Sequence, residues 1–466
     1  MGRNLLLYTD SYKQTHWWQY PQDVSYIYSY FEPRKGSFYD EIVWMGIEPY
    51  IHEYGLIGSA FIQEDIDELT QVCNAHFGIK NYPNIDGWEY ILRVHNGRLP
   101  IRIWALPAGT IVAPGTPCMA IENTDRNVPW LTNFLESVLM HCWGMTTAAT
   151  VSYDMFKRIK RYANITGEEV SPFHVNDFGV RGVPHIGVAE LNGIGHLSIF
   201  DGTDNLPAIK KIKDIYADHA VYGASVVAAE HSTITAWGKD RECDAYRHII
   251  TKADEKFKGN FVIVSLVCDS YDWEYAVDNY FCGDLKDLIL NRTGKVVCRP
   301  DSGYPPEVTL SVVKKLWDAY GGTITDNGYK LLDPHIGVIY GDHINGEMIC
   351  EILNKLVENG FAVNNVIFGS GGVLLQKYNR DTCNCAIKLS NITLFNGTEI
   401  PICKTTIGKE SKSGIFELPL VYVNGELVHN DTFKDIRDRL KTMIRFNVKK
   451  TYNLNARLYC NVIGET

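Results

Sequence analysis

The chain has 466 residues, of which 45% are hydrophobic and 21% charged, and its formal net charge is −10. These values are typical of a folded protein with a large core and two or three domains, and they argue against a disordered chain. The acidic balance, without a long basic run, argues against a general binder of nucleic acids or membrane surfaces. An anionic ligand must therefore be held by local clusters of Arg and Lys.

The twelve cysteines form no CxxC pair and show no Cys/His spacing typical of zinc. We therefore expect reduced thiols in a cytoplasmic protein. The first residues lack the apolar core of a signal peptide, and no stretch of about 18 apolar residues predicts a membrane span.

The first third of the chain mixes strands and helices. Residues 26–31 are predicted to form a strand, and residues 99–124 contain short β-type runs separated by Pro and Gly, which predicts a small antiparallel meander. From Trp130 to about Ala163 apolar residues recur at helical spacing, so one or two helices are expected.

From about Ser171 onwards, an apolar strand, a polar cluster and a helical stretch recur roughly every 25 to 40 residues, the period expected of β/α repeats. Amphipathic stretches such as 205–218 and 306–321 lie between the clusters. The seven clusters begin at Asn176, Phe200, Ala229, Cys268, Cys298, Tyr340 and Phe368. This pattern predicts an α/β fold, with an irregular (β/α) barrel over residues 171–388. Residues 1–170 and 389–466 would together form a second α+β domain.

In such a barrel the carboxyl ends of the parallel strands meet at one face, where catalytic residues gather. His231 would share this rim with other charged side chains. These are Asp177, Arg181, Asp201, Asp204, Asp269, Arg299, Asp301 and Asp342. Some acidic or amide residues after strands are expected only to cap the following helix, as Asp272 and Asn345 would.

The segment FGSGG, which includes Gly369 to Gly372, follows an apolar run and precedes a helical one, so it is predicted to form a strand, a tight turn and a helix start. Bare amides in such a turn suit a phosphate monoester. Arg181, Arg299, Arg380 and Lys388 could supply positive charge. The carboxylates Asp269, Asp301 and Asp342 suit ribose hydroxyls or, through water, a Mg²⁺ ion on a diphosphate. Phe178 is either a flat wall on the rim or a core residue.

Several motifs in order resemble the nicotinamide phosphoribosyltransferase family. They are TDSYKQTH from Thr9, DFGVRG from Asp177, AAEHSTITAWGKD from Ala228, and RPDSG from Arg299. A last motif extends from Phe368 to Lys388 and contains FGSGG and LQK. The resemblance extends from about Asn4 to Lys388. It implies transfer of a phosphoribosyl group from phosphoribosyl diphosphate to nicotinamide, with stimulation by ATP, in a homodimer with shared active sites.

The resemblance also implies roles for individual residues. Phe178 and Tyr12 of the partner subunit would enclose the pyridine ring, and Asp204 would accept the carboxamide N–H. His231 would be phosphorylated from ATP. Phosphates would be bound by Arg181, Arg299, Gly371 and Gly372, with Arg380 and Lys388 of the partner subunit. Asp301 and Asp342 would hold the ribose, and Asp269 would act with His231, Arg299 and Asp301 in catalysis. Asp10, Ser265 and Gly341 complete the expected substrate-binding set.

The carboxylate of Asp204 favours nicotinamide over nicotinate, because nicotinate would bring two like charges together. A nicotinate phosphoribosyltransferase and a non-catalytic nucleotide-binding relative stay open as alternatives. A barrel lyase or aldolase would need a Schiff-base lysine or a set of metal ligands inside the barrel, and Lys295, at the start of its strand, lies at the wrong end for the first role. Two departures from the family pattern concern phosphate and rim contacts: Ala386 stands where Ser is common, and residues 184–193 match poorly.

Overall fold

The computed structural model describes residues 4–80, 82–216, 218, 220–406, 410–453 and 456–462. The chain divides into two compact units: unit 1 comprises residues 1–150, 211–219 and 378–466, and unit 2 comprises residues 151–210 and 220–377. The sequence placed the barrel at 171–388. The earlier start of unit 2 reflects helix α6 (Trp143–Thr166), whose residues from Val151 onwards belong to unit 2.

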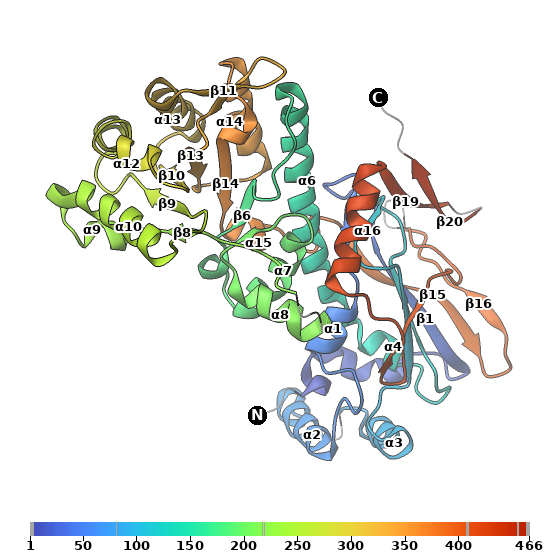
Figure 1. The fold of residues 1–466 in the computed structure, drawn as a ribbon. Coiled ribbons are helices and arrows are strands. Elements are labelled where there is room, and N and C mark those ends of the chain that lie inside the picture. Colours follow the sequence, from blue (N-terminus) through green and yellow to red (C-terminus); the bar gives the residue numbers. More distant parts are fainter. Residues whose placement is uncertain are drawn as a thin grey trace. The chain divides into compact units, whose positions relative to one another are not determined.

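Unit 2 contains a curled sheet of seven parallel strands in the order β7-β6-β14-β13-β10-β9-β8 (Figure 1). The strands are β6 (Val175–Asp177), β7 (Gly202–Thr203), β8 (Val227–Ala228), β9 (Ile263–Val267), β10 (Lys295–Arg299), β13 (Ile336–Tyr340) and β14 (Val366–Ser370). An isolated parallel bridge joins Gly202 of β7 to Ala224, three residues before β8. This bridge brings the two ends of the sheet together, so the predicted irregular (β/α) barrel is confirmed.

Helices follow most of these strands, as β/α repeats require. They are α7 (Ile186–Leu197), α8 (Leu206–Tyr216), α9 (His231–Thr235), α10 (Glu242–Lys256), α11 (Trp273–Tyr275), α12 (Lys286–Leu290), α13 (Pro305–Tyr320), α14 (Gly346–Glu358) and α15 (Gly372–Gln376). A π-helical segment, Ala276–Asp284, lies between α11 and α12, and the hairpin of β11 (Gly322–Ile324) and β12 (Lys330–Leu332) follows α13. The predicted amphipathic stretches 205–218 and 306–321 correspond to α8 and α13.

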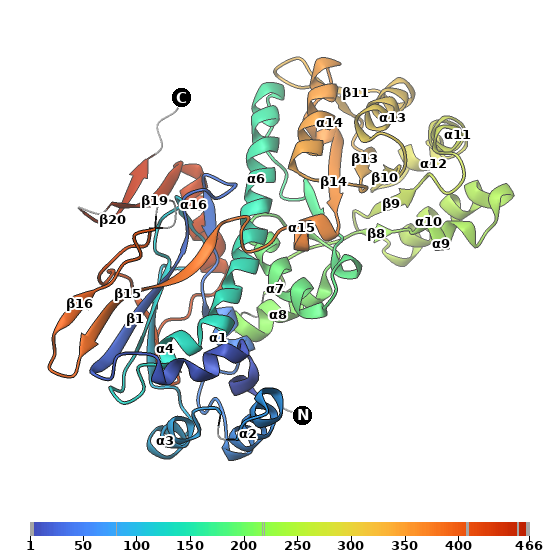
Figure 2. The ribbon, with the colours of Figure 1, turned by 180° about the vertical axis from the view of Figure 1, so that it is seen from behind.

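The core of unit 2 lies between the sheet and these helices. Val296 and Val338 of the strands belong to one buried cluster with Val312 and Leu316 of α13 and Ile352 of α14. Figure 2 shows α13 and α14 beside the strands β13 and β14. Burial of both faces explains why these strands appear in the sequence as continuous apolar runs rather than as alternating patterns.

Unit 1 is built on a seven-stranded antiparallel sheet in the order β16-β15-β1-β5-β3-β17-β18. Its strands are β1 (Val24–Pro33), β3 (Ile101–Ala105), β5 (Met119–Asn123), β15 (Cys385–Leu394), β16 (Glu399–Pro401), β17 (Leu420–Val423) and β18 (Glu426–Leu427). The N-terminal strand β1 pairs along its length with β15 from the tail of the chain (Figure 1). Unit 1 therefore contains both the N-terminal part of the chain and its tail.

A second sheet in unit 1 has the order β2-β4-β19-β20, with β2 (Ile42–Trp44), β4 (Thr110–Val112), β19 (Val448–Asn453) and β20 (Ala456–Val462). The predicted meander over 99–124 is therefore only partly right. Strands β3 and β5 pair, but β4 between them pairs with β2 and β19. Gly109 and Gly115, with φ of 77° and 90°, flank β4 and turn the chain out of the first sheet.

The helices of unit 1 are α1 (Glu48–Glu53), α2 (Gln63–Phe77), α3 (Ile85–His95), α4 (Leu131–Phe134), α5 (Glu136–Leu139) and α16 (Phe433–Arg445), preceded by a 3₁₀ segment, Ser11–Trp18. The helical pattern predicted from Trp130 corresponds to α4, α5 and α6. No helix in the described ranges is long and apolar enough to cross a membrane.

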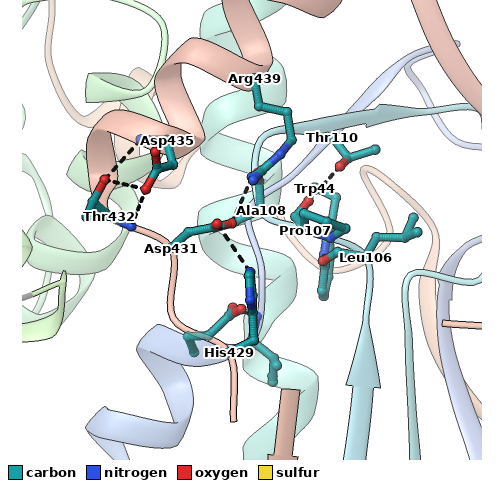
Figure 3. Close-up of polar contacts among 12 residues, drawn as sticks. Trp44, Leu106, Pro107, Ala108, Thr110, His429, Asp431, Thr432, Asp435 and Arg439 are labelled. Atoms are coloured by element: carbon teal, nitrogen blue, oxygen red, sulfur yellow. Dashed lines mark hydrogen bonds and ion pairs between the residues drawn. The ribbon is translucent and has the colours of Figure 1, made fainter. Parts of the chain in front are cut away.

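The start of α16 is tied to the loop before β4 by a polar network (Figure 3). Asp431 lies 2.8 Å from Arg439 and 3.2 Å from His429, and Arg439 also donates to the carbonyl of Ala108. Thr432 and Asp435 cap the helix reciprocally, which satisfies free N–H groups of its first turn.

Candidate active site

The polar clusters predicted after seven strands all lie at the carboxyl ends of the parallel strands in unit 2. Phe178 follows β6, Asp204 follows β7, His231 follows β8, Asp269 follows β9, Asp301 follows β10, Gly341 and Asp342 follow β13, and Gly371 and Gly372 follow β14. Because parallel strands place these ends at one edge, residues far apart in the chain share one rim.

A cavity of about 500 Å³ lies inside unit 2. Four of the predicted residues line it: Phe178, Asp204, Ser265 and Arg299. Its wall also includes Ser225 and Lys295, which the sequence reasoning did not assign to the site. A signal for Lys295 exists in the sequence, because Lys295, Val297 and Arg299 alternate along β10 and so point to the same side of the sheet.

Phe178 is held on the rim by its neighbours on β14. Its backbone N–H donates to the carbonyl of Ser370 at 2.9 Å. A Cβ atom built on Gly369 would lie 2.1 Å from Cε2 of Phe178, so the ring packs directly on the backbone of this glycine. The glycine is therefore required for the position of the ring, and Phe178 is a wall of the cavity rather than a core residue.

Asp204 presents an exposed carboxylate at the same cavity. Its Oδ1 accepts a hydrogen bond from the hydroxyl of Ser225, and its backbone N–H donates to the carbonyl of Asp177 at 3.0 Å. The carboxylate keeps acceptor capacity for a ligand, since each of its oxygens can accept two hydrogen bonds.

His231 is the first residue of α9, and its side chain is 51% exposed. Nε2 lies 2.9 Å from Oδ1 of Asp269, whose side chain is 7% exposed. A carboxylate only accepts, so Nε2 carries the proton and Nδ1 keeps its lone pair. Asp269 is therefore the acidic residue that orients the imidazole. Glu230 instead caps α9 and accepts from the hydroxyl of Ser232.

Arg299 and Asp301 form a pair at the end of β10. Nε of Arg299 is 3.2 Å from Oδ2 of Asp301, and its Nη2 donates to the carbonyl of Ala229 at 2.8 Å. Oδ1 of Asp301 is buried and accepts no hydrogen bond within the described part of the chain. Burial raises the pKa of Asp301, and Arg299 opposes this rise. The free oxygen is thus an acceptor ready for a hydroxyl group or a hydrated cation.

Gly341 leaves room beside this carboxylate, because a Cβ atom there would lie 3.1 Å from Oδ1 of Asp301. The neighbouring Asp342 lies 2.7 Å from Nδ1 of His343, which has a positive φ of 55°. The negative charges of Asp269 and Asp342 add to the rise in the pKa of Asp301. This part of the rim therefore favours a cation or hydroxyl donors.

The turn after β14 lies against the segment that carries Arg181. A Cβ atom on Gly182 would be 2.9 Å from the backbone N of Gly372, and one on Gly372 would be 2.9 Å from the carbonyl O of Gly182. Gln376 donates to this same carbonyl at 2.5 Å. The exposed Arg181 and the turn at Gly371 therefore lie side by side, and the predicted order of strand, glycine turn and helix is confirmed.

Four predicted residues belong to unit 1 and stand outside this set. Tyr12 is 58% exposed in the segment Ser11–Trp18, and Asp10 precedes it. Arg380 lies 3.2 Å from Asp381. Lys388 lies in β15, and burial lowers its pKa. The residues expected only to cap helices do so: Asp272 accepts from the N–H of Tyr275, and Asn345 from those of Glu347 and Met348.

The sequence profile of the nicotinate phosphoribosyltransferase family matches residues 173–440, more than half of the chain. The chain belongs to this family. The profile of the nicotinamide phosphoribosyltransferase N-terminal domain matches residues 4–103 of this phosphoribosyltransferase.

Two relatives share much of its sequence. A nicotinamide phosphoribosyltransferase of Xanthomonas campestris is 39% identical over 88% of this chain and 86% of its own length. A nicotinamide phosphoribosyltransferase of Acinetobacter baylyi is 32% identical over 92% of this chain and 96% of its own length. Among solved structures, human nicotinic acid phosphoribosyltransferase has a TM-score of 0.56 at 14% identity and covers 94% of this chain and 93% of its own. A nicotinate-nucleotide pyrophosphorylase from Pyrococcus furiosus has a TM-score of 0.57 at 15% identity and covers 96% of this chain and 97% of its own. At these identities the two structures show the fold alone.

Proposed function

We propose that this phosphoribosyltransferase joins nicotinamide to the phosphoribosyl group of phosphoribosyl diphosphate, giving nicotinamide mononucleotide and diphosphate in the salvage of NAD. The observation that carries the proposal is that Phe178, Asp204 and Arg299 line the same cavity. An aromatic wall, a hydrogen-bond acceptor and a guanidinium group are what a pyridine carboxamide and a sugar phosphate require of one pocket. The names of the two sequence relatives support the same reaction.

The choice of base depends on Asp204. Its carboxylate can accept the N–H of a carboxamide, whereas the carboxylate of nicotinate would meet a like charge. Nicotinate is the second candidate substrate, because the family profile carries its name. The contact of Ser225 with Asp204 leaves the negative charge in place, so we favour nicotinamide.

In this reaction the pyridine nitrogen attacks the anomeric carbon of the ribose while the bond from that carbon to the diphosphate oxygen breaks. Alignment of the ring and stabilisation of the departing diphosphate contribute most to the rate. Arg181, Arg299 and the amides at Gly371 would hold phosphate groups, and Asp301 the ribose hydroxyls. The ring becomes a cation in the product, and stacking on Phe178 favours that charge by about 0.5 to 2 kcal/mol.

The described residues include no cluster of three His, Cys, Asp or Glu side chains placed to hold a metal ion. The unpartnered Oδ1 of Asp301, beside Asp269 and Asp342, nevertheless fits a Mg²⁺ ion that arrives on the diphosphate and keeps several waters. Such an ion would neutralise charge on the leaving group.

We propose that ATP drives the reaction through His231. With its proton on Nε2 and directed to Asp269, the imidazole offers Nδ1 as the nucleophile toward the γ-phosphorus of ATP. The N–P bond would form as the bond to ADP breaks, and Asp269 would stabilise the charge on the ring. Hydrolysis of the phosphohistidine after transfer offsets an unfavourable equilibrium.

We further propose a homodimer with shared active sites. Tyr12, Trp17 and Trp18 expose 58%, 42% and 56% of their surface on one short segment, which supports contact with a second copy. Tyr12, Arg380 and Lys388 of the partner subunit would complete the site. The free cysteines of unit 1 and unit 2, such as Cys118 and Cys268, support a reducing compartment such as the cytoplasm.

The deciding experiment combines the purified protein with nicotinamide, phosphoribosyl diphosphate, Mg²⁺ and ATP, and follows the mononucleotide by chromatography. A parallel reaction contains nicotinate. We expect turnover of nicotinamide to exceed that of nicotinate by about tenfold or more. Formation of only the nicotinate product would refute the choice of base, and no product with either base would refute the proposed function.

A further inference from the structure

Asp177, the last residue of β6, carries a buried carboxylate that none of the proposed substrate contacts uses. Its Oδ1 accepts a hydrogen bond from the backbone N–H of Gly179 at 2.8 Å, and its Oδ2 accepts one from Nδ2 of Asn205 at 2.8 Å. Gly179 directly follows Phe178, and Asn205 directly follows Asp204. One carboxylate therefore connects the loop of the aromatic wall to the loop of the carboxamide acceptor.

Asn205 is itself held from several sides. Its Nδ2 also donates to the carbonyl of Ala189 at 2.9 Å, and its Oδ1 accepts from the N–H of Ala208 at 3.1 Å. Its backbone N–H donates to the hydroxyl of Thr203 at 3.0 Å. A Cβ atom on Gly193 of α7 would lie 2.5 Å from this amide nitrogen, so α7 packs closely on the side chain. Asn205 is thus a rigid link rather than a mobile one.

The carboxylate of Asp177 relies on these N–H donors. The nearby imidazole of His196 has Nε2 3.0 Å from the carbonyl of Gly202 and Nδ1 3.1 Å from the hydroxyl of Ser152. A carbonyl only accepts, so Nε2 carries the proton, and Nδ1 can accept from the serine. Burial lowers the pKa of His196, and the charge of Asp177 opposes this shift. Burial also raises the pKa of Asp177, and His196, Asn205 and the N–H of Gly179 oppose that rise, so loss of either donor would be costly.

We propose that Asp177 is a positioning residue of the pyridine pocket, which fixes the spacing between the Phe178 ring and the Asp204 carboxylate and thereby sets the affinity and choice of the base. This inference rests on the proposed function. A carboxamide can donate to Asp204 while its ring stacks on Phe178 only when the two groups are held at one separation. Strand β14 adjoins the bridge, because Ser370 pairs with Asp177 and accepts from the N–H of Phe178. Arg299 and Asp301 on β10 pair with each other instead, and Arg299 also donates to Ala229.

Two variants test the bridge. Asp177→Asn places an NH₂ group opposite one of two donors, Gly179 N–H or Asn205 Nδ2, so one bond must break. Asn205→Ser removes the donor to Asp177 but keeps a hydroxyl that can cap α8, which begins at the next residue. For both we expect the KM for nicotinamide to rise by about tenfold, with the KM for phosphoribosyl diphosphate within about twofold of the wild type. The preference for nicotinamide over nicotinate should fall with it.

Ser152→Ala is the matched control, since it removes a buried hydrogen bond to His196 in the same unit but does not touch the bridge. It should lower the Tm without a change in the KM for nicotinamide. Unchanged nicotinamide KM values in both bridge variants, or an equal rise in both KM values, would overturn the inference. If Asp177→Asn fails to fold, Asn205→Ser decides. Absence of the mononucleotide with the wild-type enzyme would instead refute the proposed function.

Discussion

His231 and Asp269 form a hydrogen bond of 2.9 Å in which the imidazole is half exposed and the carboxylate almost fully covered. This geometry predicts that His231→Ala abolishes the stimulation by ATP but keeps a slow, uncoupled transfer, because the groups that bind nicotinamide and phosphoribosyl diphosphate are untouched. Release of ADP and formation of the mononucleotide, measured with and without ATP, check this expectation.

Asp269→Asn should lower the ATP-stimulated rate by at least about tenfold, because an amide can also donate and so no longer selects the tautomer with the proton on Nε2. His76→Ala, at an exposed position of α2, is the control and should behave as the wild type. Undiminished ATP hydrolysis in His231→Ala would contradict the assignment.

Asp204→Ser tests the choice of base. The shorter, neutral side chain removes the acceptor for the carboxamide and the charge that repels nicotinate. We expect the ratio of kcat/KM for nicotinamide to that for nicotinate to fall by about 10-fold to 100-fold, which corresponds to roughly 1.4 to 2.8 kcal/mol. Competition between the two bases in one reaction measures this ratio. A ratio equal to that of the wild type would show that Asp204 does not select the base.

Gly369→Ala tests whether the packing of the Phe178 ring on Gly369 is required for binding of the base. The added Cβ atom would lie 2.1 Å from the Phe178 ring, so the ring must move. We expect a rise of about tenfold in the KM for nicotinamide. Gly283→Ala is the control, because a Cβ atom there would lie 3.8 Å from the carbonyl O of Asp278, an ordinary contact. Equal effects of the two substitutions would argue against a specific role of the Phe178 ring.

The barrel and its rim could be predicted from the sequence because each parallel strand is short, apolar and followed by polar residues. Phe178 after β6 and Asp204 after β7 were found in this way. The pairing of β4 could not be predicted, since proximity in the sequence favours β3 and β5 as partners, whereas Gly109 and Gly115 direct the strand to β2 and β19.

Other features depend on contacts across the chain. Glu230 adjoins His231 in the sequence, but its carboxylate accepts from the hydroxyl of Ser232, and the residue in contact with the imidazole is Asp269, 38 residues away. The bond between Asp177 and Asn205 spans 28 residues and joins two loops. Neither spacing follows a period of a helix or strand, so pattern analysis alone could not identify these pairs.

Mixing of two inactive variants tests the shared site of the proposed homodimer. Arg380→Ala and Asp301→Ala would each lack one part of every site, the first in unit 1 and the second in unit 2. After exchange of subunits, half of the sites in each mixed dimer would regain both groups, so activity should return to about a quarter of the wild-type value. Activity that stays at the level of the separate variants, with exchange verified by mass, would contradict shared sites.

The buried Glu48 is predicted to make the free energy of unfolding depend on pH. This residue of α1 is buried in unit 1, where its Oε2 accepts from the backbone N–H of Ile47 at 2.8 Å. Burial raises the pKa of Glu48, with Asp431 acting in the same direction and His429 against it. The folded state therefore binds this proton more tightly than the unfolded chain. As a result, the free energy of unfolding falls as the pH rises from the ordinary glutamate pKa through the raised value.

Glu48→Gln removes this dependence and keeps an acceptor for Ile47. We expect the Tm of the variant, relative to the wild type, to rise between about pH 5 and about pH 8, because only the wild type has to bury a charge at the higher pH. Thermal unfolding across this range measures the difference. Glu64→Gln, at an exposed position of α2, serves as the control and should show a constant offset. A pH-independent difference for Glu48→Gln would mean that burial does not raise the pKa of this carboxyl group.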